Sequence, residues 1–184
     1  MPERTTELTT TEYAVLGLLS HGRERSGYDL RKAVERSVGY FWAPARSHIY
    51  AVLPRLVDGG FLRGRRVAQR QRPDKQLYRI TARGREALRE WLEAGVMPEP
   101  PRNPFLLKVF FGSLASPDAM LDQIRKRRAE AERLRAELLL LDAEAGDGEV
   151  FPALTRRYGL EYADAIIRWA RSAEREVAAL KAAR

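Results

Sequence analysis

The chain has 184 residues and a formal net charge of +8, from 33 Lys and Arg residues against 25 Asp and Glu residues. It contains no cysteine, which excludes disulfides, thiolate metal sites and cysteine nucleophiles. Because it has neither a signal segment nor the run of roughly 20 apolar residues that a membrane-spanning helix needs, we expect a cytoplasmic protein.

The N-terminal third of the chain predicts three helices. Thr9 and Glu12 have the spacing of a capping box at the start of the first helix, and Ser26 has the sequence context of a second helix start. A third helix is predicted over residues 45–58, where two glycines end it. Residues 39–44 break the helical periodicity before this third helix and are a candidate short strand.

A basic hairpin follows the third helix. Two β-like runs, residues 61–67 and 77–80, flank a stretch from Gly60 to Gln76 that holds six basic residues against one acid, Asp74. A charged hairpin that projects into solvent contributes little to a core but suits the binding of phosphates. A helix followed by a basic hairpin is the order of a winged helix-turn-helix.

A fourth helix starts at Thr81, and a proline-rich segment then divides the chain. Residues 95–104 hold four of the ten prolines and are the predicted linker. The sequence therefore predicts a winged helix-turn-helix domain over residues 1–94 and a helical dimerisation domain over residues 105–184. The expected fold class is mainly α with a small β-wing.

Helical patterns fill the predicted C-terminal domain. A short apolar helix is predicted over residues 105–114, a long helix from Ser116 to about Glu144, and a last helix over residues 152–183. The long helix carries apolar residues at alternating spacings of four and three, which is typical of a coiled coil. The candidate dimerisation residues on the two long helices are Ile124, Leu134, Leu138, Leu141, Ile166, Trp169, Val177 and Leu180. The sequence leaves open whether these stripes pair within one chain or between two chains.

The positive charge is confined to one half of the chain. Residues 1–92 contain 18 Lys and Arg residues against 10 Asp and Glu residues, whereas residues 93–184 contain 15 of each. A uniformly basic protein would need no special partner, but this asymmetry indicates that the N-terminal half faces a polyanion.

The third helix has an outward face suited to reading base edges. Its apolar residues recur on one side, so Ser47, His48 and Tyr50 fall on or beside the opposite face. Small polar and basic groups on such a face fit a helix that enters the major groove. Pro54 interrupts the pattern, since an interior proline removes a hydrogen bond and costs about 3 kcal/mol. The alternative is an ordinary amphipathic core helix.

The candidate DNA-binding residues are polar or basic side chains on the second helix, the third helix and the hairpin. They are Tyr28, Lys32, Arg46, Ser47, His48, Tyr50, Arg55, Arg63, Arg65, Arg66, Arg70, Arg72 and Lys75. Helix starts favour anions because their free N–H groups and the helix dipole attract negative charge. The alternative for the hairpin arginines is a solvated charge run, and the alternative for Tyr28 is packing.

No catalytic or metal-binding constellation is present in the sequence. The two histidines, His21 and His48, have no carboxylate at ligand spacing, and there is no glycine-rich phosphate loop. We therefore expect neither an enzyme nor a cofactor.

Aromatic residues offer a further candidate feature. A cavity for a flat, small aromatic effector could be lined by Trp42, Trp91, Trp169, Phe105, Phe110 and Phe111. Core packing is the more usual role of aromatic residues at helical spacing. Both alternatives stay open from the sequence.

Three blocks of the sequence resemble the PadR family of transcriptional regulators. They are LTTTEYAVLGLLSHGRERSGYDL (residues 8–30), SHIYAVLPRLVDGGFL (residues 47–62) and QLYRITARGREALREWL (residues 76–92). The second half, from NPFLLKVFFGSL through the two long helices, resembles the longer C-terminal domain of the virulence-activator-like branch. The resemblance covers nearly the whole chain, and the blocks are specific as a set although each is weak alone.

The resemblance implies a winged helix that binds operator DNA and C-terminal helices that hold a homodimer together. It also implies repression of neighbouring genes and, in some members, a response to phenolic or drug-like ligands. Tyr50 matches the tyrosine that often touches DNA in the family, and residues 63–75 match the wing. One departure is Ala51, where many relatives have a proline directly after the Ile-Tyr pair; here Pro54 follows three residues later.

We therefore expect a sequence-specific transcriptional repressor that binds an inverted-repeat operator as a homodimer. Half-site centres should lie one helical turn, roughly 34 Å, apart. A second hypothesis is a helical adaptor that docks an acidic protein through the hairpin. A basic membrane-surface protein is less favoured, because the basic residues cluster in a hairpin rather than along one helix.

Overall fold

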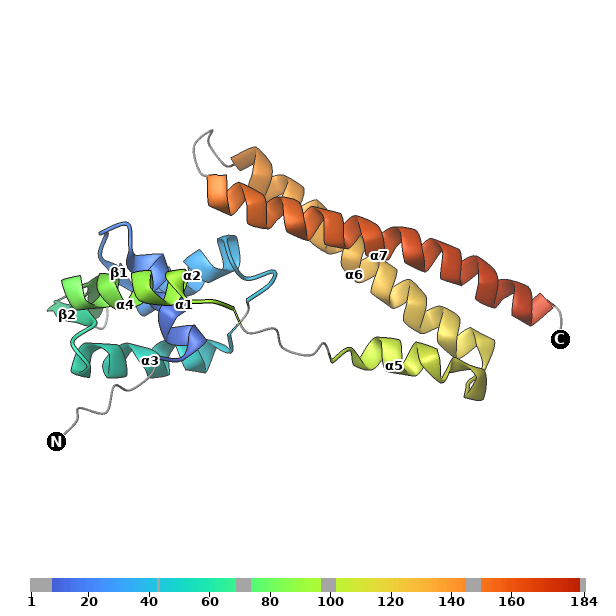
Figure 1. The fold of residues 1–184 in the computed structure, drawn as a ribbon, viewed down its shortest axis with the longest axis horizontal. Coiled ribbons are helices and arrows are strands. Elements are labelled where there is room, and N and C mark those ends of the chain that lie inside the picture. Colours follow the sequence, from blue (N-terminus) through green and yellow to red (C-terminus); the bar gives the residue numbers. More distant parts are fainter. Residues whose placement is uncertain (1–7, 43, 69–73, 97–101, 145–149, 183–184) are drawn as a thin grey trace. The chain divides into compact units, whose positions relative to one another are not determined.

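The protein forms two compact units, Met1–Met97 and Pro98–Arg184, each with its own core (Figure 1). The computed structural model describes residues 8–42, 44–68, 74–96, 102–144 and 150–182. The described chain is mostly helical with one small sheet, which confirms the predicted fold class.

Four helices build the N-terminal unit: α1 (Thr10–Leu19), α2 (Gly27–Arg36), α3 (Arg46–Asp58) and α4 (Ala82–Glu93). Three of them begin at the predicted hydroxyl side chains, Thr9, Ser26 and Thr81, each of which accepts a hydrogen bond from a first-turn N–H. Such a cap is worth about 1 kcal/mol, because it satisfies a backbone group that the helix leaves free. No side chain caps α3, so its position depends on tertiary packing.

A three-stranded antiparallel sheet completes this unit, in the order β1-β3-β2. Its strands are β1 (Arg25–Ser26), β2 (Leu62–Val67) and β3 (Lys75–Ile80). The predicted hairpin is confirmed, with Leu62 opposite Ile80 at its base. The sequence missed β1, because a strand of two residues carries no alternating pattern. The strand expected at residues 39–44 is wrong: the described residues there form turns and irregular backbone.

One apolar core joins the four helices to the base of the hairpin. Its buried members are Val15, Leu16, Leu19, Leu30, Val34, Ile49, Val52, Leu53, Leu56, Leu62, Ile80 and Leu88. Burying a side chain of this size stabilises the fold by roughly 1.5–3 kcal/mol. Because β2 and β3 each contribute a buried residue at their shared base, the wing is anchored on the helices.

Two glycines set the path from α3 through the hairpin to α4. Gly60 has φ +74°, a left-handed conformation that turns the chain from α3 into β2. At Gly84, a Cβ atom would lie 2.3 Å from the carbonyl oxygen of Phe61. The start of α4 therefore approaches the backbone ahead of β2 more closely than any side chain allows.

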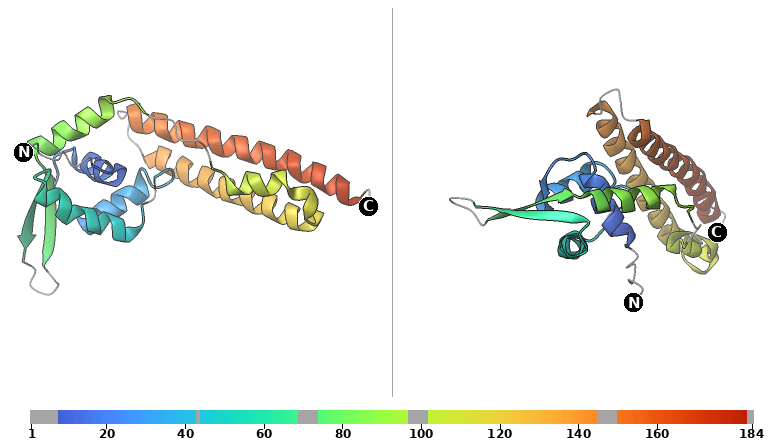
Figure 2. Two further views of the ribbon diagram at one scale, coloured as in Figure 1. Left: turned by 60° about the horizontal axis from the view of Figure 1, so that its bottom comes forward. Right: turned by 60° about the vertical axis from the view of Figure 1, so that its left-hand side comes forward.

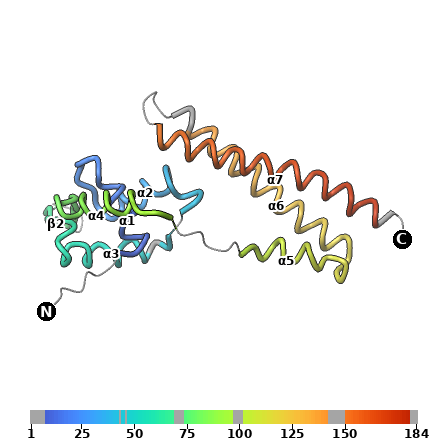
Figure 3. Tube along the Cα trace, in the orientation of Figure 1, coloured from blue at the N-terminus to red at the C-terminus, as the bar shows by residue number. Residues whose placement is uncertain are grey.

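The C-terminal unit is a long helical hairpin preceded by short helices. It contains α5 (Pro104–Phe110), a 3-10 helix η1 (Gly112–Leu114), α6 (Pro117–Glu144) and α7 (Val150–Ala182). The long helices α6 and α7 run side by side in Figures 1 and 2, and the colours of the tube in Figure 3 show that they run in opposite directions. These helices confirm the predicted order, although α7 begins two residues earlier than expected.

The core of this unit lies between α6 and α7. Its buried members are Met120, Leu121, Ile124, Ala131, Leu138, Ala163, Ile167 and Ala170. The three alanines allow the helix backbones to approach closely. Ion pairs flank this core, with 2.7 Å between Arg128 Nε and Glu174 Oε1 and 2.8 Å between Arg135 Nε and Asp164 Oδ1. These pairs help to fix the register of the two helices.

The apolar seam of α6 is filled within one chain. Ile124 and Leu138, two of the predicted dimer contacts, are 1% and 0% exposed, so no surface of theirs is left for a partner. The physical reason is that α6 and α7 follow each other closely in the sequence, so their apolar faces bury each other within one chain before they can meet a second chain. The remaining predicted contacts keep accessible surface: Leu134, Leu141, Ile166 and Val177 are half-buried, and Trp169 and Leu180 are exposed.

Candidate nucleic-acid interface

The packing of α3 decides which of its residues face outward. Its four buried residues are Ile49, Val52, Leu53 and Leu56. Ser47, His48, Tyr50, Ala51, Pro54 and Arg55 are exposed. The outward face of α3 is thus small and polar near its N-terminal end, which suits a helix that enters the major groove. The predicted faces of this helix are confirmed.

Tyr50 packs against the start of α2. A Cβ atom on Gly27 would lie 2.6 Å from Cε1 of Tyr50 and 3.4 Å from Cδ1 of Leu53. The absence of a side chain at Gly27 therefore lets the Tyr50 ring rest on the backbone of α2, which fixes how closely the two helices approach. The Tyr50 side chain is still 48% exposed, so part of it remains open to a ligand.

The helix α3 continues through Pro54. It is a single helix of 13 residues, with the proline in its second half and on its exposed side. Pro54 has no N–H, so the Tyr50 carbonyl lacks its usual helical donor. Because Pro54 lies on the exposed side, water can take the place of this donor.

Arg55 is paired inside the protein. Its Nη2 atom lies 3.3 Å from Oε1 of Glu12, whose side chain is almost fully buried. The other oxygen of Glu12 accepts hydrogen bonds from the N–H and the hydroxyl of Thr9, at 2.7 and 2.9 Å. A buried carboxylate needs such compensation of its charge. The predicted DNA contact Arg55 is thus engaged in an ion pair that joins α3 to the start of α1.

Positive charge surrounds an exposed ring at the start of α2. The Nζ atom of Lys32 lies 4.9 Å from the ring centroid of Tyr28, and Cζ of Arg31 lies 5.2 Å from it. The hydrogen bond with Lys32, followed by the charge of that lysine, lowers the pKa of the Tyr28 phenol. Tyr28 and Lys32 lie together at a helix start, where free N–H groups add to the attraction for an anion.

The wing presents basic side chains to solvent. Arg63, Arg65 and Arg66 are exposed on β2, and Lys75 is half-buried at the start of β3. Figure 2 shows β2 and β3 projecting from the helices, with α3 beside their base. The remaining predicted contacts, which are Arg70, Arg72 and the side chain of Arg46, lie outside the described residues.

Carboxylates of the same unit pair with two wing arginines. Arg65 Nη2 lies 2.6 Å from Oε2 of Glu24, and Arg66 Nε lies 2.6 Å from Oδ2 of Asp74. The hydrogen bond from Arg65 lowers the pKa of the Glu24 carboxyl group. Exposed ion pairs of this kind contribute only about 0–1 kcal/mol to stability. A DNA phosphate can therefore replace either carboxylate at small cost.

Asp29 ties the wing to the start of α2. Its Oδ2 atom accepts hydrogen bonds from the hydroxyl and the N–H of Ser26, at 2.7 and 2.9 Å, and lies 3.1 Å from Nζ of Lys75. The Ser26 hydroxyl, with the Ser26 N–H and Lys75, lowers the pKa of Asp29 to about 2. Asp29 is therefore ionised throughout the neutral pH range and holds Lys75 at the edge of β3.

An open groove at the base of the wing is lined by four arginines. Arg63 comes from β2, Arg79 from β3, and Arg83 and Arg85 from the first turn of α4. Only Arg63 among them was predicted from the sequence to meet phosphate. Arg79 could have been predicted as a phosphate contact from the register of the hairpin, because it lies directly opposite Arg63. Nothing in the sequence except their charge indicated Arg83 and Arg85.

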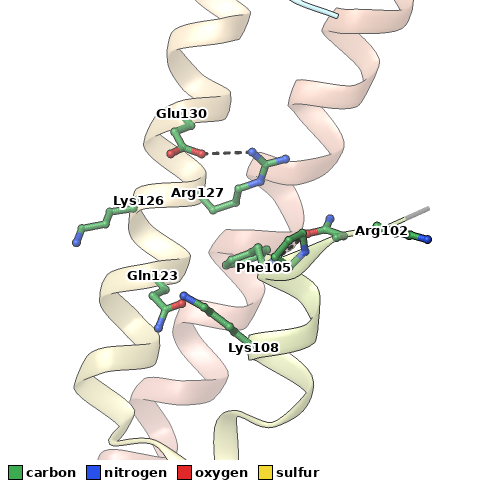
Figure 4. Close-up of a pocket in the computed structure, with 9 residues that line it drawn as sticks. Arg102, Phe105, Lys108, Gln123, Lys126, Arg127 and Glu130 are labelled. Atoms are coloured by element: carbon green, nitrogen blue, oxygen red, sulfur yellow. Dashed lines mark hydrogen bonds and ion pairs between the residues drawn. The ribbon is translucent and has the colours of Figure 1, made fainter. Parts of the chain in front are cut away.

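A second cavity lies in the C-terminal unit, between α5 and α6. Its lining residues are Arg102, Asn103, Pro104, Phe105, Lys108, Gln123, Lys126, Arg127 and Glu130. In Figure 4, Lys108 reaches toward Gln123, whereas Lys126 extends away from α5. Arg127 is fixed by Glu130, 3.3 Å away, and donates to the Tyr162 hydroxyl at 3.1 Å. The cavity combines an aromatic ring with a cationic rim, which suits a small anion with an apolar body.

The predicted cavity residues are divided between the two units, Trp42 and Trp91 in the first and the other four in the second. Most of their rings form separate pairs: Trp91 with Tyr13, Trp169 with Phe105, and Phe110 with Phe111. Of the six predicted residues, Phe105 alone is among the lining residues of the cavity between α5 and α6.

Other site types find no support in the described residues. No three His, Cys, Asp or Glu side chains among them gather in a way that could hold a metal ion. None of the described helices is long and apolar enough to cross a membrane. His21 and His48 are both exposed.

Two family profiles match the chain in succession. Residues 15–90 match the transcriptional regulator PadR-like family, and residues 101–178 match the virulence activator alpha C-terminal domain. Between them the profiles cover most of both units.

Relatives and solved structures agree with these profiles. The chain is 36% identical over 140 residues to the negative transcriptional regulator PadR of Bacillus subtilis strain 168, which covers 72% of this chain and 76% of that protein. The crystal structure of B. subtilis PadR with operator DNA has a TM-score of 0.79 at 28% identity, covering 92% of this chain and 99% of that one.

Two further solved structures show the same similarity. B. subtilis PadR in complex with p-coumaric acid has a TM-score of 0.72 at 25% identity, covering 92% of this chain and 98% of that one. The Vibrio cholerae virulence activator AphA has a TM-score of 0.74 at 25% identity, covering 93% and 99%. Both units of the chain are therefore similar to solved relatives.

Replacing Arg55 tests its role as the partner of Glu12. We expect Arg55→Ala to lower the free energy of unfolding of the N-terminal unit by about 1–3 kcal/mol, because the buried carboxylate loses its cation. Urea unfolding measures this change, and a double-mutant cycle with Glu12→Gln isolates the pair. Arg89→Ala, at an exposed arginine of α4, is the control and should change little. An unchanged stability in Arg55→Ala would show that the pair has no structural role.

Proposed function

The chain belongs to the PadR-like family of transcriptional regulators, and we propose that it represses transcription by binding an inverted-repeat operator as a homodimer. Family membership confirms the resemblance predicted from the sequence, and it makes the protein a regulator rather than an enzyme. The observation that carries the proposal is the small polar face of α3 beside a basic wing. A relative that is named a negative regulator and has been solved with operator DNA supports it.

In the proposed complex, α3 lies in the major groove and the wing follows the backbone. The proposed contacts to base edges and adjacent phosphates are Arg46, Ser47, His48 and Tyr50. The proposed phosphate or minor-groove contacts of the wing are Arg63, Arg65, Arg66, Arg70, Arg72 and Lys75. Tyr28 and Lys32 would hold a further phosphate at the start of α2.

The paired wing cations influence how this complex forms. Arg65, Arg66 and Lys75 each have a carboxylate partner in the free protein. Phosphates would replace these carboxylates on binding, so each paired cation contributes less than an unpaired one. Arg63, which has no carboxylate partner within the described chain, is the strongest single candidate on β2.

A titration against DNA tests the proposal. With DNA from upstream of the protein's own gene and a shuffled control, we expect a preference of about a thousandfold at fixed salt. Arg63→Gln should weaken binding to both duplexes and lower the slope of log affinity against log salt by roughly one for each half-site. Ser47→Ala should cost about 1–3 kcal/mol at one base pair and relax specificity there. Fluorescence anisotropy at several salt concentrations measures both effects.

The control for this titration is Arg89→Gln, which removes one exposed charge from α4. It should leave affinity and slope close to those of the wild type. Equal binding of the wild type to operator and shuffled DNA would contradict the repressor proposal. Absence of DNA binding at low salt would favour the protein-adaptor alternative.

The proposed dimer needs an apolar surface that the hairpin of α6 and α7 has not already used. The helix α5 offers one, since Leu106, Leu107 and Phe110 are exposed there, Phe110 by 79%. Contiguous apolar surface of this kind marks an interaction site in a water-soluble unit. Trp169 and Leu180 on α7 keep accessible surface as well. We assign the dimer contact to these residues rather than to Ile124 and Leu138.

A charge on α5 tests this assignment. We expect Phe110→Glu to shift the protein from a dimer toward a monomer, because a carboxylate would have to be buried in an apolar interface. Light scattering at micromolar concentration measures the mass. Since Phe110 is exposed in a single chain, the variant should keep its helical content. The matched control is Ser113→Glu, and a Phe110→Glu protein that stays dimeric would contradict the assignment.

A specific cavity also favours regulation by a small aromatic effector. The cavity between α5 and α6 has Phe105 in its lining and Lys108 and Arg127 on its rim. A ring can pack on the phenylalanine while a carboxylate meets the cations. The solved complex of B. subtilis PadR with p-coumaric acid supports an effector of this class.

We expect p-coumarate to raise the melting temperature of the protein, because it would bind the folded state only. Lys108→Gln should reduce this shift, since it removes the cation beside the cavity. Arg125→Gln is the matched control, because Arg125 is an exposed cation of α6 that does not line the cavity. Acetate, which has the charge without the ring, should give no shift. An unchanged response of Lys108→Gln would place the effector elsewhere.

A further inference from the structure

The groove at the base of the wing gathers four arginines and has no acidic side chain in its lining. We refer to its four arginines, Arg63, Arg79, Arg83 and Arg85, as the arginine groove. The other lining residues are apolar, glycine or threonine, and no carboxylate is among them. Four like charges around one groove repel each other unless an anion is present.

Among the described residues, none of the four guanidinium groups forms a direct ion pair with a carboxylate, although the charge of Arg79, after the hydrogen bond and charge of Arg65, helps to lower the pKa of the Glu24 carboxyl group. The neighbouring wing arginines differ, since Arg65 and Arg66 each pair with a carboxylate. The exposed Arg89 of α4 pairs with two carboxylates on its own helix. The absence of direct ion pairs thus distinguishes this groove from the neighbouring arginines of the same unit.

Uncharged partners hold two of these arginines in place. The Cζ atom of Arg83 lies 4.8 Å from the ring centroid of Phe61, and Nη1 of Arg85 donates to a backbone carbonyl at 3.4 Å. Arg63 and Arg79 lie directly opposite each other in the β2–β3 ladder, an arrangement that destabilises a strand pair when both residues carry the same charge. The fold therefore gathers positive charge here with only partial compensation, which comes from Glu24 acting on Arg79. The positive end of the α4 dipole adds to the same field.

We propose that the arginine groove binds phosphates of operator DNA outside the segment that α3 and the far end of the wing contact, an inference that rests on the proposed function. The strand β2 has six residues, so its base lies about 17 Å from its far end. Successive phosphates on one strand advance only about 3.4 Å along the duplex axis. The two ends of the wing therefore meet different phosphates, and the groove extends the contact along the backbone.

The geometry favours DNA over a free anion as the source of phosphate. The groove is open, and its β2 member, Arg63, belongs to the same strand as Arg65 and Arg66 of the wing. A duplex that lies along β2 can continue into this groove, and several phosphates can occupy it together. The contact carries no sequence information, because a phosphate is the same at every base pair.

The double variant Arg79→Gln/Arg83→Gln tests the proposal with the full-length protein. Its binding is compared with that of the wild type on the upstream duplex and on the shuffled control. We expect affinity to fall at least tenfold on both duplexes, while the ratio between them stays the same. The slope of log affinity against log salt should fall by roughly 0.9 for each phosphate that the variant no longer neutralises.

Two controls separate charge from folding. Arg79→Lys/Arg83→Lys keeps the charge and should retain most of the salt slope. Arg89→Gln/Arg175→Gln removes the same net charge at exposed positions that do not line the groove and should leave the slope unchanged. The melting temperature of each variant is measured alongside, so that a loss of fold is not mistaken for weaker phosphate binding.

The outcomes are distinct. A glutamine variant with wild-type affinity and slope overturns the arginine groove as a DNA contact, while specific binding by the wild type leaves the proposed function intact. A wild type that shows no preference for the upstream duplex overturns both. If inorganic phosphate stabilises the wild type but not the glutamine variant, and both bind DNA equally, the groove serves a free anion and the DNA proposal fails.

Discussion

The burial of one side of α3 is the constraint on which the N-terminal unit depends. Ile49, Val52, Leu53 and Leu56 enter a core that also receives residues from the three other helices and the base of the hairpin. A helix buried on one side must expose the other. The outward face of α3 and the position of the wing are therefore consequences of a single core, and neither can shift without disturbing the other.

The charged side chains of this unit also depend on one another. Carboxylates hold some cations in the free protein, as Glu12 holds Arg55 and Asp29 holds Lys75. Such pairs limit the repulsion that a net positive charge brings to a compact fold. The arginine groove stands apart because four positive charges are gathered there without a direct ion pair among the described residues. Some cations of the wing, such as Lys75, are therefore held by a carboxylate of the protein. Others, such as Arg63, form no ion pair among the described residues and can bind a ligand.

The C-terminal unit shows how a seam typical of a coiled coil can be satisfied within one chain. The buried side chains of α6 pack against α7, and ion pairs between the helices fix their register. Because the facing apolar residues of α6 and α7 are already buried within one chain, contact with a partner has to use a different surface. The exposed apolar side chains of α5 are the surface that we propose for the dimer contact.

Features that depend on neighbouring residues could be predicted from the sequence. The caps at Thr9, Ser26 and Thr81, the faces of α3 and the basic hairpin all follow from local hydrogen bonds or from the period of a helix or strand. The family resemblance came from the order of such local blocks. The meeting of distant residues, such as Arg55 with Glu12 or Arg63 with Arg83, emerged only in the folded chain. Local patterns do not encode these distances, because each depends on how separate elements pack around a shared core.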